Sequence, residues 1–194
     1  MTPQKNIKQK LIRAAIECIE KMGLHNTTSR EIVKRAGANL AAINYHFNSK
    51  ENLIEIAINQ TLEAAFENMI REKLSAKQYP KFALYTFFLD FLDRELQYPG
   101  IIKAFLDKLQ EENGDKNKSI NNLKNFFDRL INNLSKILPN MGDEEIKLST
   151  LQTLSGITFI CVNRNLLNQI ANINLSKSKD KQKIIKNIVS RNFY

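Results

Sequence analysis

The spacing of apolar residues along the chain constrains the fold more than any other feature. Apolar residues recur at intervals of three and four through most of the 194 residues, and only six glycines and four prolines interrupt them. Alternation of β-branched and polar residues is almost absent. A period near 3.6 residues is that of an amphipathic α-helix, whereas strands alternate with a period of two. The sequence therefore predicts an all-α protein.

The breaks in this pattern divide the chain into nine expected helices. They cover about residues 4–22, 30–36, 40–47, 49–79, 80–97, 101–112, 117–138, 143–172 and 178–192. Gly23, Pro80 and the Pro99-Gly100 pair mark ends, because glycine stops helices and proline cannot continue them. Ser49 and Asp143 are short polar residues at helix starts, where we expect each to be the N-terminal cap.

One stretch, from residue 151 to residue 170, is apolar around most of its helical circumference. A helix of this kind does not lie on the surface of a monomer. We expect it either at the centre of its domain or with one face against another subunit. Ser155 and Gly156 are small enough to permit close approach of a second helix.

Other features exclude several kinds of site. Cys18 and Cys161 are far apart in apolar helical patterns, so we interpret them as reduced packing residues. His25 and His46 have no partner at ligand spacing, so neither a metal site nor a cofactor is expected. The first residues lack an apolar signal region, and no run reaches the ~18 apolar residues that span a bilayer. We expect a cytoplasmic protein with no membrane partner.

Charge is distributed unevenly along the chain. The net charge is +9, with +6 in residues 1–50, −2 in residues 51–176 and +5 in residues 177–194. A basic N-terminal region fits a polyanionic partner, of which DNA is the commonest. Charge alone leaves open the alternative of a solvated basic face.

The segment TTSREIVKRAGANLAAINYHFNSKENL, at residues 27–53, has the pattern of a helix-turn-helix. Residues 30–36 and 40–47 form two short helices separated by Gly37, which permits a sharp turn. Ile43 and Phe47 lie four residues apart and would pack against the first helices. In such motifs the N-terminal part of the second helix contacts base edges in the major groove of DNA.

The side chains around this turn suit contact with DNA. Leu40 or Ala41 could contact a thymine methyl group, and Asn44 could pair with an adenine edge. The polar members suit phosphate contacts, and the start of the helix near Ser49-Lys50 adds backbone N–H groups. The predicted DNA-contacting residues are Thr28, Ser29, Arg30, Asn39, Leu40, Ala41, Asn44, Tyr45, His46 and Lys50.

This segment resembles the DNA-binding domain of the TetR/AcrR family of transcriptional regulators, over about residues 7–55. The residues that carry the resemblance are Gly23, Thr27, Thr28, Ile32, Ala36, Gly37, Ile43, Tyr45, Phe47, Lys50 and Leu53. Ala38 stands where the family more often has valine. The resemblance implies a helix-turn-helix domain at residues 1–50 and a larger helical ligand-binding and dimerisation domain at residues 51–194. It also implies a homodimer that binds operator DNA and is released by a small-molecule effector.

The second domain is rich in phenylalanine, which allows two interpretations. The first is an aromatic core. The second is an apolar ligand cavity with a few polar groups for orientation. The candidate pocket residues are Phe87, Phe88, Phe91, Phe105, Phe126 and Phe159.

The sequence thus predicts a repressor that leaves a near-palindromic operator when it binds a small hydrophobic ligand. A related regulator without an inducer, or an activator, is the alternative within DNA binding. A helical interaction protein whose basic region meets an acidic partner is a further alternative. An enzyme is not expected, because neither a catalytic triad nor a glycine-rich phosphate loop is present.

Overall fold

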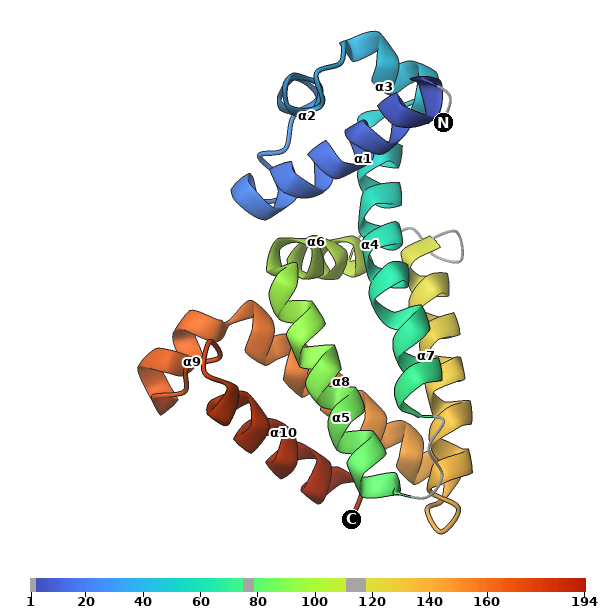
Figure 1. Cartoon of the computed structure of the whole chain (residues 1–194), viewed down its shortest axis with the longest axis vertical. Helices are drawn as coiled ribbons and strands as arrows, with labels where there is room; N and C mark the ends of the chain where they lie inside the picture. Colours follow the sequence, from blue (N-terminus) through green and yellow to red (C-terminus); the bar gives the residue numbers. More distant parts are fainter. Residues whose placement is uncertain (1–2, 75–78, 111–117) are drawn as a thin grey trace. The chain divides into compact units, whose positions relative to one another are not determined.

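The computed structural model describes residues 3–74, 79–110 and 118–194, and the described part is all-α, as predicted. The expected helix ends at residues 112 and 117 lie outside the described residues. The helices within the described ranges are α1 Pro3–Met22, α2 Ser29–Ala36, α3 Leu40–Phe47, α4 Lys50–Lys73, α5 Pro80–Gln97, α6 Pro99–Gln110, α7 Lys118–Ile137, α8 Asp143–Val162, α9 Arg164–Ala171 and α10 Ser178–Asn192 (Figure 1).

The chain forms two compact units. Unit 1 consists of Met1–Ala64 with Tyr98–Ile120, and unit 2 consists of Ala65–Gln97 with Asn121–Tyr194. The first part of α4 and the whole of α6 therefore pack with the N-terminal helices, so this packing unit extends beyond residue 50. A functional boundary at residue 50 stays a prediction.

The N-terminal part of unit 1 is a small core built by α1, α2, α3 and the start of α4. Apolar residues that share one face of α1, among them Leu11, Ala15 and Cys18, enter this core, as the sequence pattern predicts. Its buried members are Leu11, Ile12, Ala14, Ala15, Cys18, Ile32, Val33, Ala36, Ile43, Phe47, Leu53 and Ala57. Because α2 and α3 have only eight residues each, these contacts rather than intrinsic helix stability hold them in place.

Helix α6 packs on α1 in the same unit through a carboxylate cap. The Glu20 carboxylate accepts backbone N–H bonds from Gly100 at 3.1 Å and from Ile101 at 2.7 Å. These N–H groups belong to the first turn of α6, where no intrahelical partner is available. Ile101 and Ala104 are buried beside the cap, so a polar contact and an apolar contact fix α6 together.

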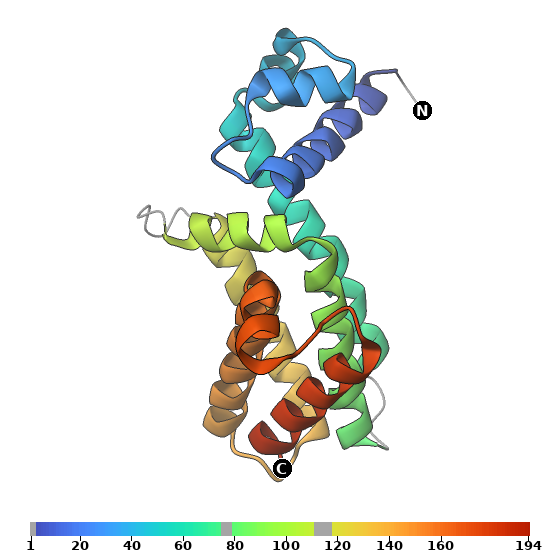
Figure 2. The ribbon, with the colours of Figure 1, turned by 90° about the vertical axis from the view of Figure 1, so that its left-hand side faces the viewer.

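Unit 2 has one continuous apolar core. Helices α5, α8 and α10 pack against one another, and α5 and α10 run side by side in Figures 1 and 2. Phe87 and Phe88 have perpendicular rings 5.1 Å apart, and Phe88 stacks on Phe193 at 5.5 Å. Leu130 and Leu134 bring α7 into the same core.

Two details of the α8 region differ from the sequence prediction. The helix expected over residues 143–172 is wrong, because α8 ends at Val162 and α9 begins at Arg164. Asn163 lies between them with φ −108° and ψ 28°, outside the helical region. The predicted cap at Asp143 is also wrong: Gly142 holds the cap position, and Asp143 is the first helical residue. Its carboxylate instead accepts a hydrogen bond from Ser135 at 3.3 Å.

The core of unit 2 contains a buried acid, Glu95, which is 3% exposed. One carboxylate oxygen accepts a hydrogen bond from the Thr158 hydroxyl at 2.8 Å, and the other oxygen has no hydrogen-bond partner among the described residues. Burial raises the pKa of Glu95 from its ordinary 4.5 to about 7, and the Thr158 bond opposes this effect only in part. Folding therefore favours the protonated form of this side chain.

Both cysteines are free and buried, as predicted. Within the described ranges, no helix combines the length and the apolar character needed to cross a membrane.

The first prediction concerns the approach of α6 to α1. A Cβ atom at Gly100 would lie 2.9 Å from the Cα of Glu20 and 3.0 Å from the backbone oxygen of Ile19. Since these are backbone atoms, Gly100→Ala must displace α6 and weaken both bonds to Glu20. We expect a loss of about 1–3 kcal/mol in the free energy of unfolding by urea. Gly156→Ala is the control, because a Cβ there meets no atom within 4 Å and alanine is favourable in the interior of α8. An equal effect of the two changes would contradict the close approach.

The second prediction concerns Glu95 and pH. Because the folded state binds this proton more tightly than the unfolded state, stability falls as pH rises from 4.5 to about 7 and then levels off. At about 1.4 kcal/mol for each pH unit, the loss is about 3 kcal/mol. Glu95→Gln should remove this decline, so the variant gains stability relative to the natural protein as pH rises. Urea unfolding between pH 4.5 and 8 measures the difference, with Glu72→Gln as an exposed control. Parallel pH profiles for Glu95→Gln and the natural protein would refute the prediction.

Candidate DNA interface

Local hydrogen bonds build the turn between α2 and α3 as the sequence predicts. Thr28 caps α2, its hydroxyl accepting the N–H of Glu31 at 3.2 Å, and Asn39 caps α3, its side-chain oxygen accepting the N–H of Ala42 at 3.0 Å. Gly37 lies between them with φ 63° and ψ 40°, a left-handed conformation that glycine adopts without strain. The chain thus turns between two capped helices within three residues.

The side chains of α3 divide into a buried and an exposed face. Ile43 and Phe47 are buried in the core of the N-terminal helices. The opposite face presents Leu40, Ala41, Asn44 and Tyr45 to solvent, and Tyr45 is 72% exposed. Helix α3 contains no lysine, arginine, aspartate or glutamate, and its ionisable side chains are Tyr45 and His46. The exposed face can therefore offer apolar contacts and neutral hydrogen bonds to base edges.

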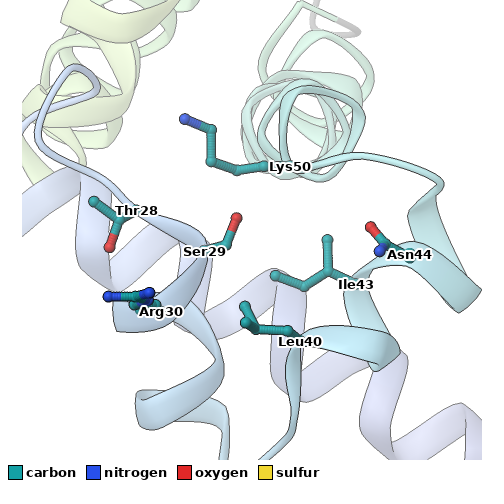
Figure 3. Close-up of a pocket in the computed structure, with 7 residues that line it drawn as sticks. All are labelled: Thr28, Ser29, Arg30, Leu40, Ile43, Asn44 and Lys50. Carbon is teal, nitrogen blue, oxygen red and sulfur yellow. The ribbon is translucent and has the colours of Figure 1, made fainter.

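An open hollow of about 560 Å³ connects α3 with the starts of α2 and α4. Figure 3 shows side chains from all three helices around it, with Lys50 facing the side chains of α2 and α3 across the hollow. The lining residues are Thr28, Ser29, Arg30, Leu40, Ile43, Asn44 and Lys50. Six of these seven are predicted DNA-contacting residues, and the seventh, Ile43, is buried.

The hollow is suited to negatively charged groups. Arg30 and Lys50 supply positive charge, and the N-termini of α2 and α4 supply backbone N–H groups. A hydrogen bond from its own backbone N–H lowers the pKa of the Glu51 carboxyl group, and Lys50 adds to this effect. Lys50 lies 3.6 Å from the Glu51 carboxylate, so it would exchange this weak surface pair for a phosphate.

The remaining predicted contacts lie beside the hollow. The ring of His46 is half-buried and perpendicular to that of Tyr45, with ring centres 4.8 Å apart. Asn39 is exposed, but its side-chain oxygen is engaged in the cap of α3. All ten predicted residues thus belong to one continuous region of unit 1. Their individual contacts with DNA stay predictions.

The candidate pocket phenylalanines do not form one group. Phe87, Phe88, Phe91 and Phe126 are buried in the core of unit 2. Phe105 instead packs against the cluster around Ile101 in unit 1. Phe159 is 58% exposed. The number of phenylalanines in the sequence suggests a single site, but their spacing does not determine which helix face meets which core.

Sequence reasoning assigned no role to three polar residues that the structure places in specific contacts. Glu95 follows Phe88, Phe91 and Leu92 on one helical stripe, so its burial could have been inferred from spacing. The cap that Glu20 provides to α6 joins residues 80 apart, and no local signal predicts it. Asn52 occupies a predictable first-turn position in α4, but its bond to the Phe47 carbonyl could not be foreseen.

Comparison with known sequences identifies relatives of this region. Residues 11–57 match the family described as "Bacterial regulatory proteins, tetR family". The negative transcriptional regulator of the biofilm operon icaADBC, IcaR from Staphylococcus aureus, is 28% identical over 148 residues, covering 74% of each chain. The regulator BetI 1 from Chromohalobacter salexigens is 27% identical over 99 residues, covering 51% of this chain and 49% of that protein. The chain thus spans about half the length of BetI 1.

Solved structures share the fold across the whole chain. The fatty acid degradation regulator FadR from Bacillus halodurans has a TM-score of 0.74 at 16% identity, covering 100% of this chain and 96% of its own. A regulator from Aquifex aeolicus has a TM-score of 0.67 at 19% identity, covering 95% and 98%.

The capped helix-turn-helix, the neutral exposed face of α3 and the flanking basic hollow are features of a DNA-binding module. The matched segment and the relatives show that residues 11–57 are similar to the corresponding segment of TetR-family transcriptional regulators. Members of this family bind DNA and act as dimers, typically as repressors.

The third prediction separates attraction to phosphate from base reading. Lys50→Ala should weaken binding equally to a duplex selected from a random pool and to its scrambled version, and should reduce the salt slope by about one. Asn44→Ala should cost about 1–3 kcal/mol on the selected duplex alone. Fluorescence anisotropy at several salt concentrations measures both. Lys124→Ala, an exposed lysine of α7, is the charge control. Sequence-selective loss in Lys50→Ala would contradict this division.

Proposed function

We propose that this protein is a homodimeric repressor that binds a near-palindromic operator and leaves it when a small hydrophobic effector binds. The observation that carries the DNA-binding part is the exposed face of α3 beside a hollow that favours negative charge. In this proposal Leu40, Ala41 and Asn44 contact bases. The contacts to the DNA backbone come from Thr28, Ser29, Arg30, Asn39, Tyr45, His46 and Lys50. Repression is supported by the similarity to IcaR, which is described as a negative regulator.

Exposed apolar side chains in unit 2 support the homodimer. Leu148, Leu151 and Phe159 lie on one face of α8 at helical spacing, and all are at least half exposed. Leu166 and Ile170 of α9 are also exposed. An exposed apolar face of this kind marks an interaction surface, and a two-fold dimer would bury it against its own copy. We place the interface on α8, α9 and α10, which span about residues 143–172 and 178–192. The Asn192 amide of α10 donates to the Thr153 hydroxyl of α8 at 2.7 Å.

A two-fold dimer sets the form of the operator. Its two α3 helices would enter successive major grooves about 34–36 Å apart, so the two half-sites mirror each other. The effector would then act by favouring a dimer conformation whose α3 spacing does not match the DNA. Helix α4 contributes residues to both units, which makes it the candidate mechanical link.

The effector would bind unit 2 among the buried aromatic side chains. Phe87, Phe88, Phe91 and Phe126 supply an apolar lining, and Glu95 with Thr158 supplies polar groups for orientation. The close ring contacts of Phe87 and Phe88 also support the alternative of a regulator without an inducer. If the protein does bind an effector, the aromatic core must open to admit it.

Thermal unfolding with candidate hydrophobic compounds distinguishes a regulator that binds an effector from one without an inducer, because an effector that binds the folded state raises the unfolding temperature.

The fourth prediction tests the dimer and the operator together. Leu151 is 53% exposed on the proposed interface, and Leu123 of α7 is 38% exposed outside it. Leu151→Glu should convert the protein from dimer to monomer at micromolar concentration, because the interface would have to bury a carboxylate. Leu123→Glu should remain dimeric. Sedimentation velocity measures the state, and a duplex selected by the natural protein should show inverted half-sites. A monomeric natural protein, or selection without inverted half-sites, would refute the dimeric operator complex.

A further inference from the structure

The corner between α3 and α4 joins the two parts of the DNA-binding surface. Helix α3 carries the exposed face that meets bases, and α4 begins with Lys50 and the N–H groups suited to phosphate. Two residues separate the helices. The first, Asn48, has a left-handed φ of 66°, and its N–H donates to the Asn44 carbonyl at 3.0 Å. The angle between base-reading and phosphate-binding elements is therefore set within a very short stretch of chain.

Asn52 of α4 spans this corner. Its side-chain amide donates to the carbonyl of Phe47, the last residue of α3, at 2.7 Å. A carbonyl oxygen can only accept, so the side-chain atom that faces it is the nitrogen. The backbone N–H of Asn52 donates to the Ser49 hydroxyl at 3.1 Å, which caps α4. One residue thus ties the end of α3 to the start of α4.

This use of Asn52 differs from an ordinary capping box. In that motif a longer Glu or Gln at the same position reaches back to the N–H of the capping residue. The shorter amide of Asn52 instead satisfies a carbonyl at the C-terminal end of α3, which has no partner within its own helix. The bond therefore joins two helices, whereas a capping box stabilises one.

We propose that Asn52 is a positioning residue for sequence reading, which rests on the DNA-binding role proposed above. Burial of Ile43 and Phe47 keeps α3 on the core, but apolar contacts are non-directional. The directional bond from Asn52 fixes the rotation of α3 about the corner. Leu40 lies seven residues from Phe47, so at 1.5 Å per residue a rotation of about 10° would move its position by about 2 Å. A displacement of that size exceeds what hydrogen bonds to bases tolerate.

The test replaces Asn52 by leucine, which keeps a similar shape, adds no charge and removes the donor. Leucine also has a higher helix propensity than asparagine, so α4 is not weakened. The probe is a duplex selected from a random pool by the natural protein, with a scrambled duplex for comparison. Asn52→Leu should lower affinity for the selected duplex about tenfold and leave affinity and salt slope on the scrambled duplex unchanged. Hydrogen exchange should accelerate at the amides of residues 44–48, while the unfolding temperature is not lowered.

Asn133→Leu is the matched control. The Asn133 amide donates to the Arg129 carbonyl at 2.8 Å within α7. Asn133→Leu therefore also removes a hydrogen bond from a side-chain amide to a backbone carbonyl, but in unit 2. It should leave both affinities unchanged. Unchanged affinity of Asn52→Leu for the selected duplex would overturn the inference, as would an equal loss on both duplexes with a lower unfolding temperature. If the natural protein selected no sequence at all, the proposed function would fail first, and this inference with it.

Discussion

Burial of Ile43 and Phe47 is the interaction on which the DNA-binding surface depends. Helix α3 has only eight residues, too few to be stable in water alone, so it exists because these two side chains enter the core formed by α1, α2 and α4. Their burial also decides which residues face outward. A shift of one residue in this helix would rotate it by about 100° and replace the exposed Leu40 and Asn44 with other side chains. The same two contacts therefore provide stability and select the surface.

Helix α4 connects this arrangement to the rest of the chain through three different packing environments. Leu53 and Ala57 belong to the core of the N-terminal helices, and Ile54 and Ile58 pack with α6. Further along, Met69 and Ile70 enter the core of unit 2. The Glu20 cap ties α6 back to α1, so within unit 1 both α4 and α6 are fixed to the helix that supports α3. Unit 1 therefore contains two routes by which a change in helix position could reach the DNA-binding surface.

Local signals explain how much could be predicted from sequence. The bounds of α3, the left-handed Gly37 and the caps Thr28 and Asn39 follow from residue types within a few positions of one another. The break at Asn163 carries neither glycine nor proline, so the apolar pattern continued across it and the predicted helix was too long. Hydrogen bonds between residues distant in sequence could not be predicted. The spacing of α5 could place Glu95 on a buried stripe, but only the fold brings Thr158 to it. The exposure of Phe159 likewise depends on which face of α8 the core covers.

The absence of lysine, arginine and acidic residues from α3 has a consequence for how such a regulator can diverge. In the proposed complex, overall attraction to DNA would come from Arg30, Lys50 and the helix N-termini, and discrimination among sequences from the small and neutral side chains of α3. After gene duplication, one copy of the regulator could therefore acquire a new target sequence through changes at Leu40, Ala41 or Asn44, while its sequence-independent affinity for DNA stayed the same. Binding strength and target choice are separable traits in this architecture, and that separation also makes α3 a practical starting point for engineering regulators that do not cross-react.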